Sequence, residues 1–271
     1  MVRDTILHHP TGIDDIARQP LPPSLTRRAG LAASPDALDT TLAYQPVVSL
    51  TNGHIMAAEM IAGWPIRQPP IARNTQARRR QADSQMAAAI SAAAQWPASV
   101  ALWLDVPSIP DGDPGFPDQI ARMLQECGLA PERLSLELPE SLAAGIDIDR
   151  LMWLSAVRDL GVGVILDGFG SWVASLAALR RLPLTGMKLD HGLVCGVPEE
   201  REDVAIVRAA VDAARNLGLQ VIAEGIETES QRAFLSAIGC EYGQGVLFSH
   251  PLQDDALRHH FTHAAVKATG A

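Results

Sequence analysis

Short apolar runs alternate with longer stretches of helical periodicity along most of the chain. The apolar runs are short enough to be buried strands, whereas the longer stretches repeat their apolar positions every three or four residues. The runs cover residues 42–48, 54–61, 100–104, 134–138, 162–166, 186–189, 220–223 and 245–248. The amphipathic stretches between them include residues 84–95, 147–160, 199–217 and 230–238. This alternation predicts a mainly parallel sheet, and eight runs favour a (β/α)8 barrel over a doubly wound sheet.

The beginning of the chain departs from this pattern. Thr51-Asn52-Gly53, between the first two runs, is typical of a hairpin turn, so the first strand is predicted to be antiparallel. Residues 1–38 carry scattered prolines and no sustained period, and we interpret them as a flexible N-terminal arm. The expected fold class is therefore α/β, with a TIM-like barrel over residues 39–271.

Composition and charge narrow the class of protein. With 47% hydrophobic and 20% charged residues the chain can bury a large core, which excludes general disorder. The 22 basic and 31 acidic residues give a net charge of −9, which argues against a nucleic acid polymer as partner. Three widely spaced cysteines predict a reducing compartment without disulfides or zinc. With no signal sequence or membrane-length apolar stretch, we expect a soluble cytoplasmic protein without membrane insertion.

Charged residues gather where the predicted strands end. In a parallel barrel these ends converge on one mouth, which holds the active site. The residues at these ends are Glu59, Asp105, Glu137, Asp167, Lys188, Asp190 and Glu224. Each acid alone could be a helix cap or a surface ion pair, but together they would repel one another unless a cation neutralised them. Oxygen ligands favour Mg²⁺, Mn²⁺ or Ca²⁺, and such ions commonly act on phosphate esters.

The same acids argue against a second possible role of Lys188, that of a Schiff-base lysine. Lys188 could form a Schiff base, as in aldolase-like barrels, but that chemistry requires a neutral amine. A ring of carboxylates would keep the amine protonated. The residues therefore point to a metal-bound phosphate ester.

Several motifs, in order along the chain, resemble the EAL-domain family of cyclic di-GMP phosphodiesterases. The resemblance covers roughly residues 40–255. Its motifs are YQPVVSLTNGHIMAAEMI, LSLELPES, LDGFGSWVASLAALRRLPLTGMKLD and AEGIETESQRAFLSAIGCEYGQGVLFSHPL. Glu59-Met60-Ile61 stands where the family has Glu-Ala-Leu. The resemblance implies an EAL-type (β/α)8 barrel with an antiparallel first strand, in agreement with the hydrophobic pattern.

The resemblance also implies a role for each matching residue. Glu59, Glu137 and Asp167 would bind the first metal ion, and Lys188 would hold the attacking water or a phosphate oxygen. Glu224 would act at a second metal ion or accept a proton. Two further residues are implied to support the site: Gln244, and Glu140, which would steady the loop after Asp167 and couple metal occupancy to dimer contacts.

Four positions depart from the family pattern. Gly168 replaces the second aspartate of the loop, a ligand of the second metal ion, and Asp105 stands where the family has an asparagine ligand. Gly63 replaces the arginine that grips the dinucleotide phosphate, and Thr185 replaces an aspartate before the lysine. These changes predict a weakened or single-metal site, with Mg²⁺ or Mn²⁺ as the ion and Ca²⁺ as a non-productive one.

The departures lead to one main hypothesis and two alternatives. The main hypothesis is a catalytically inactive or very weak member that serves cyclic di-GMP signalling as a nucleotide receptor or protein-interaction module. Its partners would be cyclic di-GMP, bound weakly, and a protein partner or a second copy of the chain. The first alternative is an active phosphodiesterase that makes linear pGpG, with Asp105 compensating for Gly168. The second is a protein-binding scaffold that has lost both nucleotide and metal.

Overall fold

The computed structural model describes residues 42–61, 75–105, 115–143, 146–171 and 179–263. All of them belong to the unit Thr40–Ala271, and the predicted N-terminal arm lies outside them. The strands are β1 (Ala43–Ser49), β2 (Ile55–Ile61), β3 (Ala101–Asp105), β4 (Leu134–Pro139), β5 (Gly163–Phe169), β6 (Gly186–Leu189), β7 (Gln220–Ala223), β8 (Tyr242–Gly243) and β9 (Leu252–Gln253).

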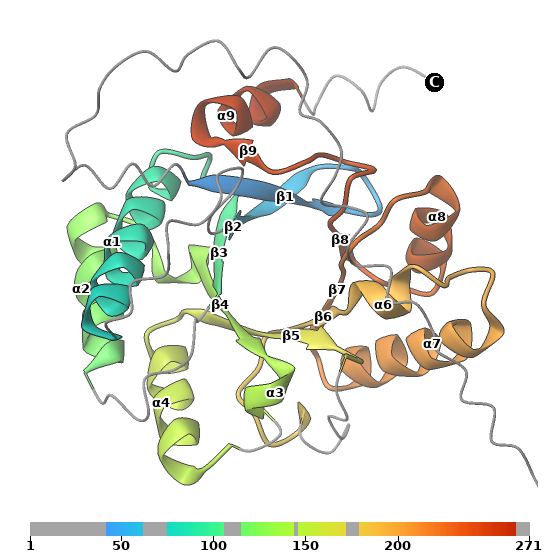
Figure 1. Ribbon diagram of the computed structural model, residues 1–271, viewed down its shortest axis with the longest axis horizontal. Coiled ribbons are helices and arrows are strands. Elements are labelled where there is room, and N and C mark those ends of the chain that lie inside the picture. The colour runs from blue at the N-terminus through green and yellow to red at the C-terminus, as the bar shows by residue number, and fades with distance from the viewer. Residues whose placement is uncertain (1–41, 62–74, 106–114, 144–145, 172–178, 264–271) are drawn as a thin grey trace, which may run out of the picture. The chain divides into compact units, whose positions relative to one another are not determined.

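Helices surround the ring of strands (Figure 1). They are α1 (Thr75–Ala93), α2 (Phe116–Cys127), α3 (Glu140–Ala143), α4 (Ile148–Asp159), α6 (His191–Val194), α7 (Arg201–Asn216), α8 (Glu229–Ala237) and α9 (Asp254–His263). A short 3-10 helix, η3 (Pro131–Arg133), precedes β4. Within the described part of the chain, no helix has the length and apolar character needed to cross a membrane.

The sheet closes on itself, which confirms the predicted barrel. Strands β2 to β7 follow one another in parallel, β8 joins β7, and β1 pairs antiparallel with both β8 and β2. The hairpin between β1 and β2 turns at Gly53, whose φ of 72° lies in the left-handed region that glycine adopts most easily. Its neighbour Asn52 accepts a hydrogen bond from the backbone N–H of His54. The expected antiparallel start is therefore confirmed.

One predicted strand lies elsewhere. The run 245–248 was expected to be the eighth strand, but β8 is Tyr242–Gly243 and the chain turns directly after it. The backbone N–H groups of Phe248 and Ser249 both donate to the carbonyl of Gly245. At Gly245 the backbone comes so close to that of Ile226 that no side chain would fit between them. A strand cannot continue there because the local hydrogen bonds already form a turn.

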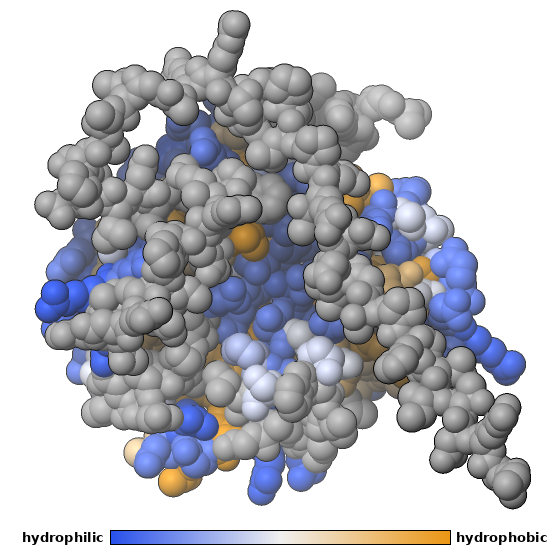
Figure 2. All heavy atoms as spheres, viewed as in Figure 1, coloured by the Kyte–Doolittle hydropathy of each residue, from blue (hydrophilic) through white to orange (hydrophobic). Residues whose placement is uncertain are grey.

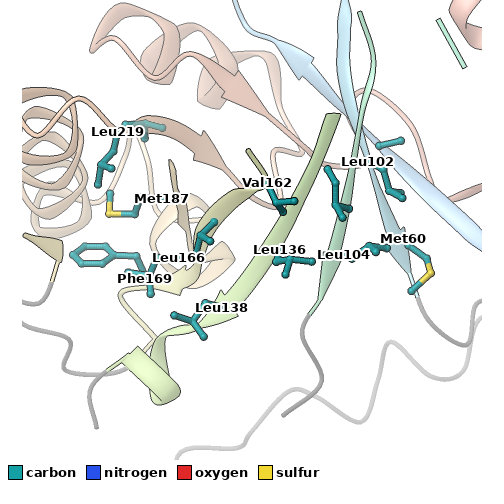
Figure 3. Close-up of a cluster of buried hydrophobic side chains, with 14 of the residues drawn as sticks. Met60, Leu102, Leu104, Leu136, Leu138, Val162, Leu166, Phe169, Met187 and Leu219 are labelled. Carbon is teal, nitrogen blue, oxygen red and sulfur yellow. The ribbon is translucent and has the colours of Figure 1, made fainter. Parts of the chain in front are cut away.

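The core has two layers because side chains of a strand alternate between its faces. The outward-facing layer packs under the helices and includes Leu102, Leu104, Leu136 and Leu166 (Figure 3). A separate inward-facing cluster fills the barrel: Val47, Ala57, Trp103, Ile165 and Ile222. The residues two positions further toward the barrel mouth are polar on all five of these strands. The apolar cluster therefore forms the floor beneath the polar side chains.

Candidate functional site

A polar layer lies directly above the apolar floor of the barrel. The period of two along each strand brings its members inward at the mouth. The layer consists of Gln45 of β1, Glu59 of β2, Asp105 of β3, Glu137 of β4, Asp167 of β5, Lys188 of β6, and Glu224 and Gln244, which follow β7 and β8. From the same side as Figure 1, the space-filling view shows hydrophilic residues gathered at the barrel centre (Figure 2).

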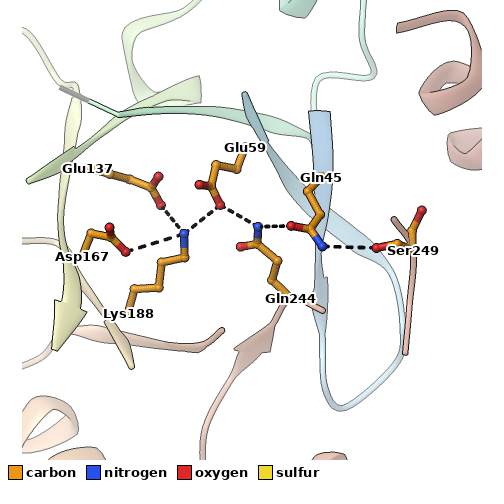
Figure 4. A network of polar contacts seen from close by, with 7 residues as sticks. All are labelled: Gln45, Glu59, Glu137, Asp167, Lys188, Gln244 and Ser249. Atoms are coloured by element: carbon orange, nitrogen blue, oxygen red, sulfur yellow. Dashed lines mark hydrogen bonds and ion pairs between the residues drawn. The ribbon is translucent and has the colours of Figure 1, made fainter. Parts of the chain in front are cut away.

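Lys188 lies in the middle of this layer. Its side chain is buried, and its Nζ donates to Glu59 Oε2 at 2.7 Å and to Glu137 Oε1 at 3.3 Å. The same nitrogen lies 3.6 Å from Asp167 Oδ1 (Figure 4). One cation therefore faces three carboxylates, and the described part of this layer holds more negative than positive charge.

Three carboxylates are close enough to share a metal ion. One oxygen each from Glu59, Asp105 and Glu137 lies within 4.8 Å of the others. Glu137 is fully buried, and its Oε2 has no hydrogen-bond partner among the described residues. The amide Oε1 of buried Gln244 likewise has no hydrogen-bond partner among the described residues. Because both atoms are acceptors, they require a cation or a proton donor, and a hard divalent ion with oxygen ligands fits the site.

The crowding of acids changes their proton affinities. Loss of water around the carboxyl of Asp105, together with the nearby charge of Glu59, raises its pKa to about 6, although the residue is exposed at the rim. Burial and the charge of Glu59 raise the pKa of Glu137 well above its usual value. Burial also raises the pKa values of Asp167 and Glu224, against the opposing charge of Lys188.

Lys188 shows the complementary effect. Burial by itself would lower the pKa of its ammonium group. The charges of Glu137 and Glu59 outweigh this effect, and the pKa is raised well above 10.5. Lys188 therefore stays protonated at neutral pH, which excludes its use as a neutral Schiff-base amine without a large change in its surroundings.

The metal-free protein is expected to become more stable as the pH falls from about 7 to about 5.5. An acid with a raised pKa binds more protons in the folded state, so the free energy of unfolding falls as pH rises between the two pKa values. For Asp105 the pH range between the two pKa values runs from 3.8 to about 6. The pKa of Glu137 is raised as well, so it changes the stability in the same direction. Urea denaturation in EDTA at both pH values measures the change.

Bound Mn²⁺ is expected to reverse this trend, because a cation binds the ionised carboxylates and competes with protons. The same denaturation series in excess Mn²⁺ is therefore the matched control. Greater stability of the metal-free protein at pH 7 than at pH 5.5 would contradict the assigned direction.

The loop after Asp167 offers no second ligand at the next position. Gly168 has a φ of 71°, and the pairing of β5 with β6 loses its regular register there. Its carbonyl accepts hydrogen bonds from both the backbone N–H and the Oγ of Ser171. Oε2 of buried Glu140 lies 3.4 Å from the same hydroxyl and is an alternative acceptor for its proton. This contact links the loop to α3 at the end of β4.

The structure brings most of the predicted site residues together. Glu59, Asp105, Glu137, Asp167, Lys188, Glu224 and Gln244 all belong to the polar layer around the mouth. Glu224 borders an adjoining pocket. Glu140 lies outside this group, and Gly63 falls outside the described residues. The Thr185 hydroxyl makes two hydrogen bonds with the backbone of Val164, which is a structural role.

The pocket contains residues that the sequence did not single out. Its lining consists of Gln45, His191, Glu224, Gly225, Glu227, Gly245 and Val246. Gln45 could have been found from the alternation of β1, because it lies two positions from Val47 of the apolar floor. His191 begins α6 two positions after the end of β6, and Glu227 follows Glu224 by three positions. Neither position carries a signal in the hydrophobic pattern.

Comparison with known proteins identifies the family. Residues 31–251 match the family described as EAL domain. The chain belongs to the EAL domain family. Over 141 residues this EAL domain is 42% identical to the cyclic di-GMP phosphodiesterase NbdA of Pseudomonas aeruginosa, covering 52% of the chain and 18% of NbdA. Over 241 residues it is 31% identical to the bifunctional diguanylate cyclase/cyclic di-GMP phosphodiesterase MucR of that organism, covering 80% of the chain and 33% of MucR.

Solved structures show the same barrel. The PaMucR phosphodiesterase in complex with c-di-GMP aligns with a TM-score of 0.73 and 30% identity, covering 80% of this chain and 93% of that one. The calcium/cy-diGMP complex of Klebsiella pneumoniae BlrP1 aligns with a TM-score of 0.72 and 27% identity, covering 79% of this chain and 56% of that one. The EAL domain described here spans at most about a third of the two curated relatives.

Proposed function

We propose that this EAL domain binds cyclic di-GMP through a divalent ion and hydrolyses it very slowly or not at all. The observation that carries the proposal is the combination of three converging carboxylates with a glycine at position 168. The carboxylates would supply one cation site, whereas Gly168 has no side-chain oxygen for a second ion. The similar barrels of PaMucR and BlrP1 support cyclic di-GMP as the ligand, because their structures are complexes with this dinucleotide.

In this proposal Glu59, Asp105 and Glu137 hold Mg²⁺ or Mn²⁺, with Ca²⁺ as a non-productive substitute. The bound ion would polarise a phosphoryl oxygen of the ligand. Lys188, charged and hydrogen-bonded to two of the carboxylates, would orient a phosphate oxygen or the attacking water. Glu224 borders the open pocket and has a raised pKa, so it would accept a proton there.

The weak turnover follows from the missing groups. Replacement of the phosphate-gripping arginine by Gly63 removes a charge-assisted contact of about 1.5–3 kcal/mol, which weakens binding roughly 10- to 100-fold. Absence of a second ion removes several kcal/mol of transition-state stabilisation. Binding therefore survives at high ligand concentration better than catalysis does. A protein partner or a second copy of the chain would respond to the bound state in the cytoplasm.

The decisive experiment is isothermal titration calorimetry of cyclic di-GMP into the purified protein. Titrations with Ca²⁺ and then Mg²⁺ are expected to give heat, and the Mg²⁺ sample is expected to contain little or no linear pGpG afterwards. Product formed at an ordinary enzyme rate, about 10 per second, would make the protein an active phosphodiesterase. Absence of heat and product from folded protein would leave a scaffold without nucleotide.

A further inference from the structure

Two glutamines connect Glu59 to the chain segment that follows β8. Gln244 Nε2 donates to Glu59 Oε2 at 2.6 Å and to Gln45 Oε1 at 2.9 Å. Gln45 Nε2 in turn donates to the backbone carbonyl of Ser249 at 3.2 Å. Figure 4 shows this row of contacts running from Lys188 across the barrel mouth to Ser249. Gln45 is half-buried and Gln244 is buried.

The row ends on an acceptor at each side, and these two acceptors set its direction. A backbone carbonyl can only accept hydrogen bonds, so Gln45 must turn its amide N–H₂ toward Ser249 and its Oε1 toward Gln244. Gln244 must then present its own N–H₂ to Gln45. The second proton of that group reaches Glu59. The acceptors at the two ends of the row, the Ser249 carbonyl and the Glu59 carboxylate, therefore require the same orientation of the Gln244 amide.

This orientation has two consequences for the site. Glu59 Oε2 accepts from both Lys188 and Gln244, which uses its two lone pairs and leaves Oε1 of the same carboxylate for a cation. The Gln244 Oε1 is buried without a partner among the described residues. Figure 4 shows it on the side of the amide where Lys188 lies. It can accept a hydrogen bond from a water molecule bound at the cation site.

We propose that Gln45 is a positioning residue for this site, acting through Gln244 on the metal-binding carboxylate of Glu59. The inference rests on the proposed function, because it requires that the carboxylates bind a divalent ion. Removal of the Gln45 amide takes away the acceptor of the second Gln244 proton and leaves Glu59 as the one partner of that N–H₂ group in the row. Gln244 would then be free to shift together with the carboxylate, which would lose its fixed orientation. Partners of metal ligands typically contribute 10- to 100-fold to metal affinity.

The test is a double-mutant cycle in Mn²⁺ affinity, measured by calorimetry without nucleotide. Methionine is the replacement because it keeps the unbranched shape and removes the amide. Gln45→Met and Gln244→Met are each expected to weaken Mn²⁺ binding at least about tenfold. The double variant is expected to bind Mn²⁺ like Gln244→Met alone, because Gln45 acts only through Gln244. A role limited to packing would give additive effects instead.

Gln231→Met is the matched control. Gln231 is another buried glutamine, which accepts from the N–H groups of Glu227 and Thr228 at the start of α8. Its loss is expected to lower stability without changing Mn²⁺ affinity. Unchanged Mn²⁺ affinity in Gln45→Met, or additive losses in the double variant, overturns the role of Gln45 alone. Failure of the unaltered, folded protein to bind Mn²⁺ overturns the proposed function together with this inference.

Discussion

Replacing Lys188 with methionine is expected to lower the free energy of unfolding of the metal-free protein by about 3–5 kcal/mol at pH 7. Lys188 is 1% exposed and lies within 4 Å of three carboxylates, those of Glu59, Glu137 and Asp167. Without the ammonium group these buried charges repel one another and have no other described cation beside them. Urea denaturation in EDTA measures the loss.

Two further conditions distinguish this explanation from a simple packing defect. Excess Mn²⁺ is expected to restore much of the stability of Lys188→Met, because a divalent ion replaces the missing positive charge. Lowering the pH to about 5.5 is expected to reduce the loss, since the raised pKa values of Glu137 and Asp167 let protons neutralise them. A loss that neither Mn²⁺ nor acid changes would show that packing, rather than charge, is responsible.

Arg258→Met supplies the control for loss of an ion pair. Arg258 contacts Asp254 four residues earlier on α9 at 2.8 Å, and both side chains are partly exposed. Water and salt screen such a pair, so its removal is expected to change the free energy of unfolding by about 0.3–0.5 kcal/mol. The contrast with Lys188 separates a buried charge centre from an ordinary helical ion pair.

Gly168→Asp is expected to raise the hydrolysis of cyclic di-GMP by up to about a thousandfold. The change places a carboxylate next to Asp167, where the family carries a second metal ligand. If a second ion stabilises the transition state by about 4 kcal/mol, the hydrolysis rate rises about a thousandfold. Appearance of linear pGpG over time, with saturating Mn²⁺ and nucleotide, measures it.

The same substitution carries a structural cost. The φ of 71° at Gly168 is left-handed, a conformation that costs an L-residue about 1–2 kcal/mol and aspartate less than most. A Cβ there would lie 3.3 Å from the Ser171 hydroxyl, which must shift slightly. We therefore expect Gly168→Asp to be less stable than the unaltered protein when no metal is present.

Gly168→Ala distinguishes the effect of a new metal ligand from the effect of backbone strain at this position. Alanine adds the same Cβ and a backbone penalty at least as large as that of aspartate, but it brings no oxygen. It is expected to lower stability without increasing hydrolysis. Equal rates in the alanine and aspartate variants would contradict the view that the missing ligand limits turnover. A high rate in the unaltered protein would instead assign compensation to Asp105.

The hydrophobic pattern predicted the first seven strands to within a few residues, and the runs 186–189 and 220–223 are identical to β6 and β7. Residues 134–138 and 162–166 coincide closely with β4 and β5, because their outward positions are apolar and adjacent helices cover them. The eighth strand was misplaced because β8 is only two residues long and depends on pairing with β7 and β1. An apolar run just beyond it, starting at Gly245, gave the stronger local signal.

The sequence by itself determined the family, the closed barrel and the acids at the ends of β2, β3, β4, β5 and β7, because motif order and period-two alternation are local properties of the chain. Only the tertiary structure decided which acids share one cation site and how Gln45 orients Gln244. Glu59, Asp105 and Glu137 lie on three different strands, so the spacing of their oxygens depends on the stagger and closure of the barrel. The direction of the amide row likewise depends on a backbone carbonyl that lies 204 positions further along the chain from Gln45.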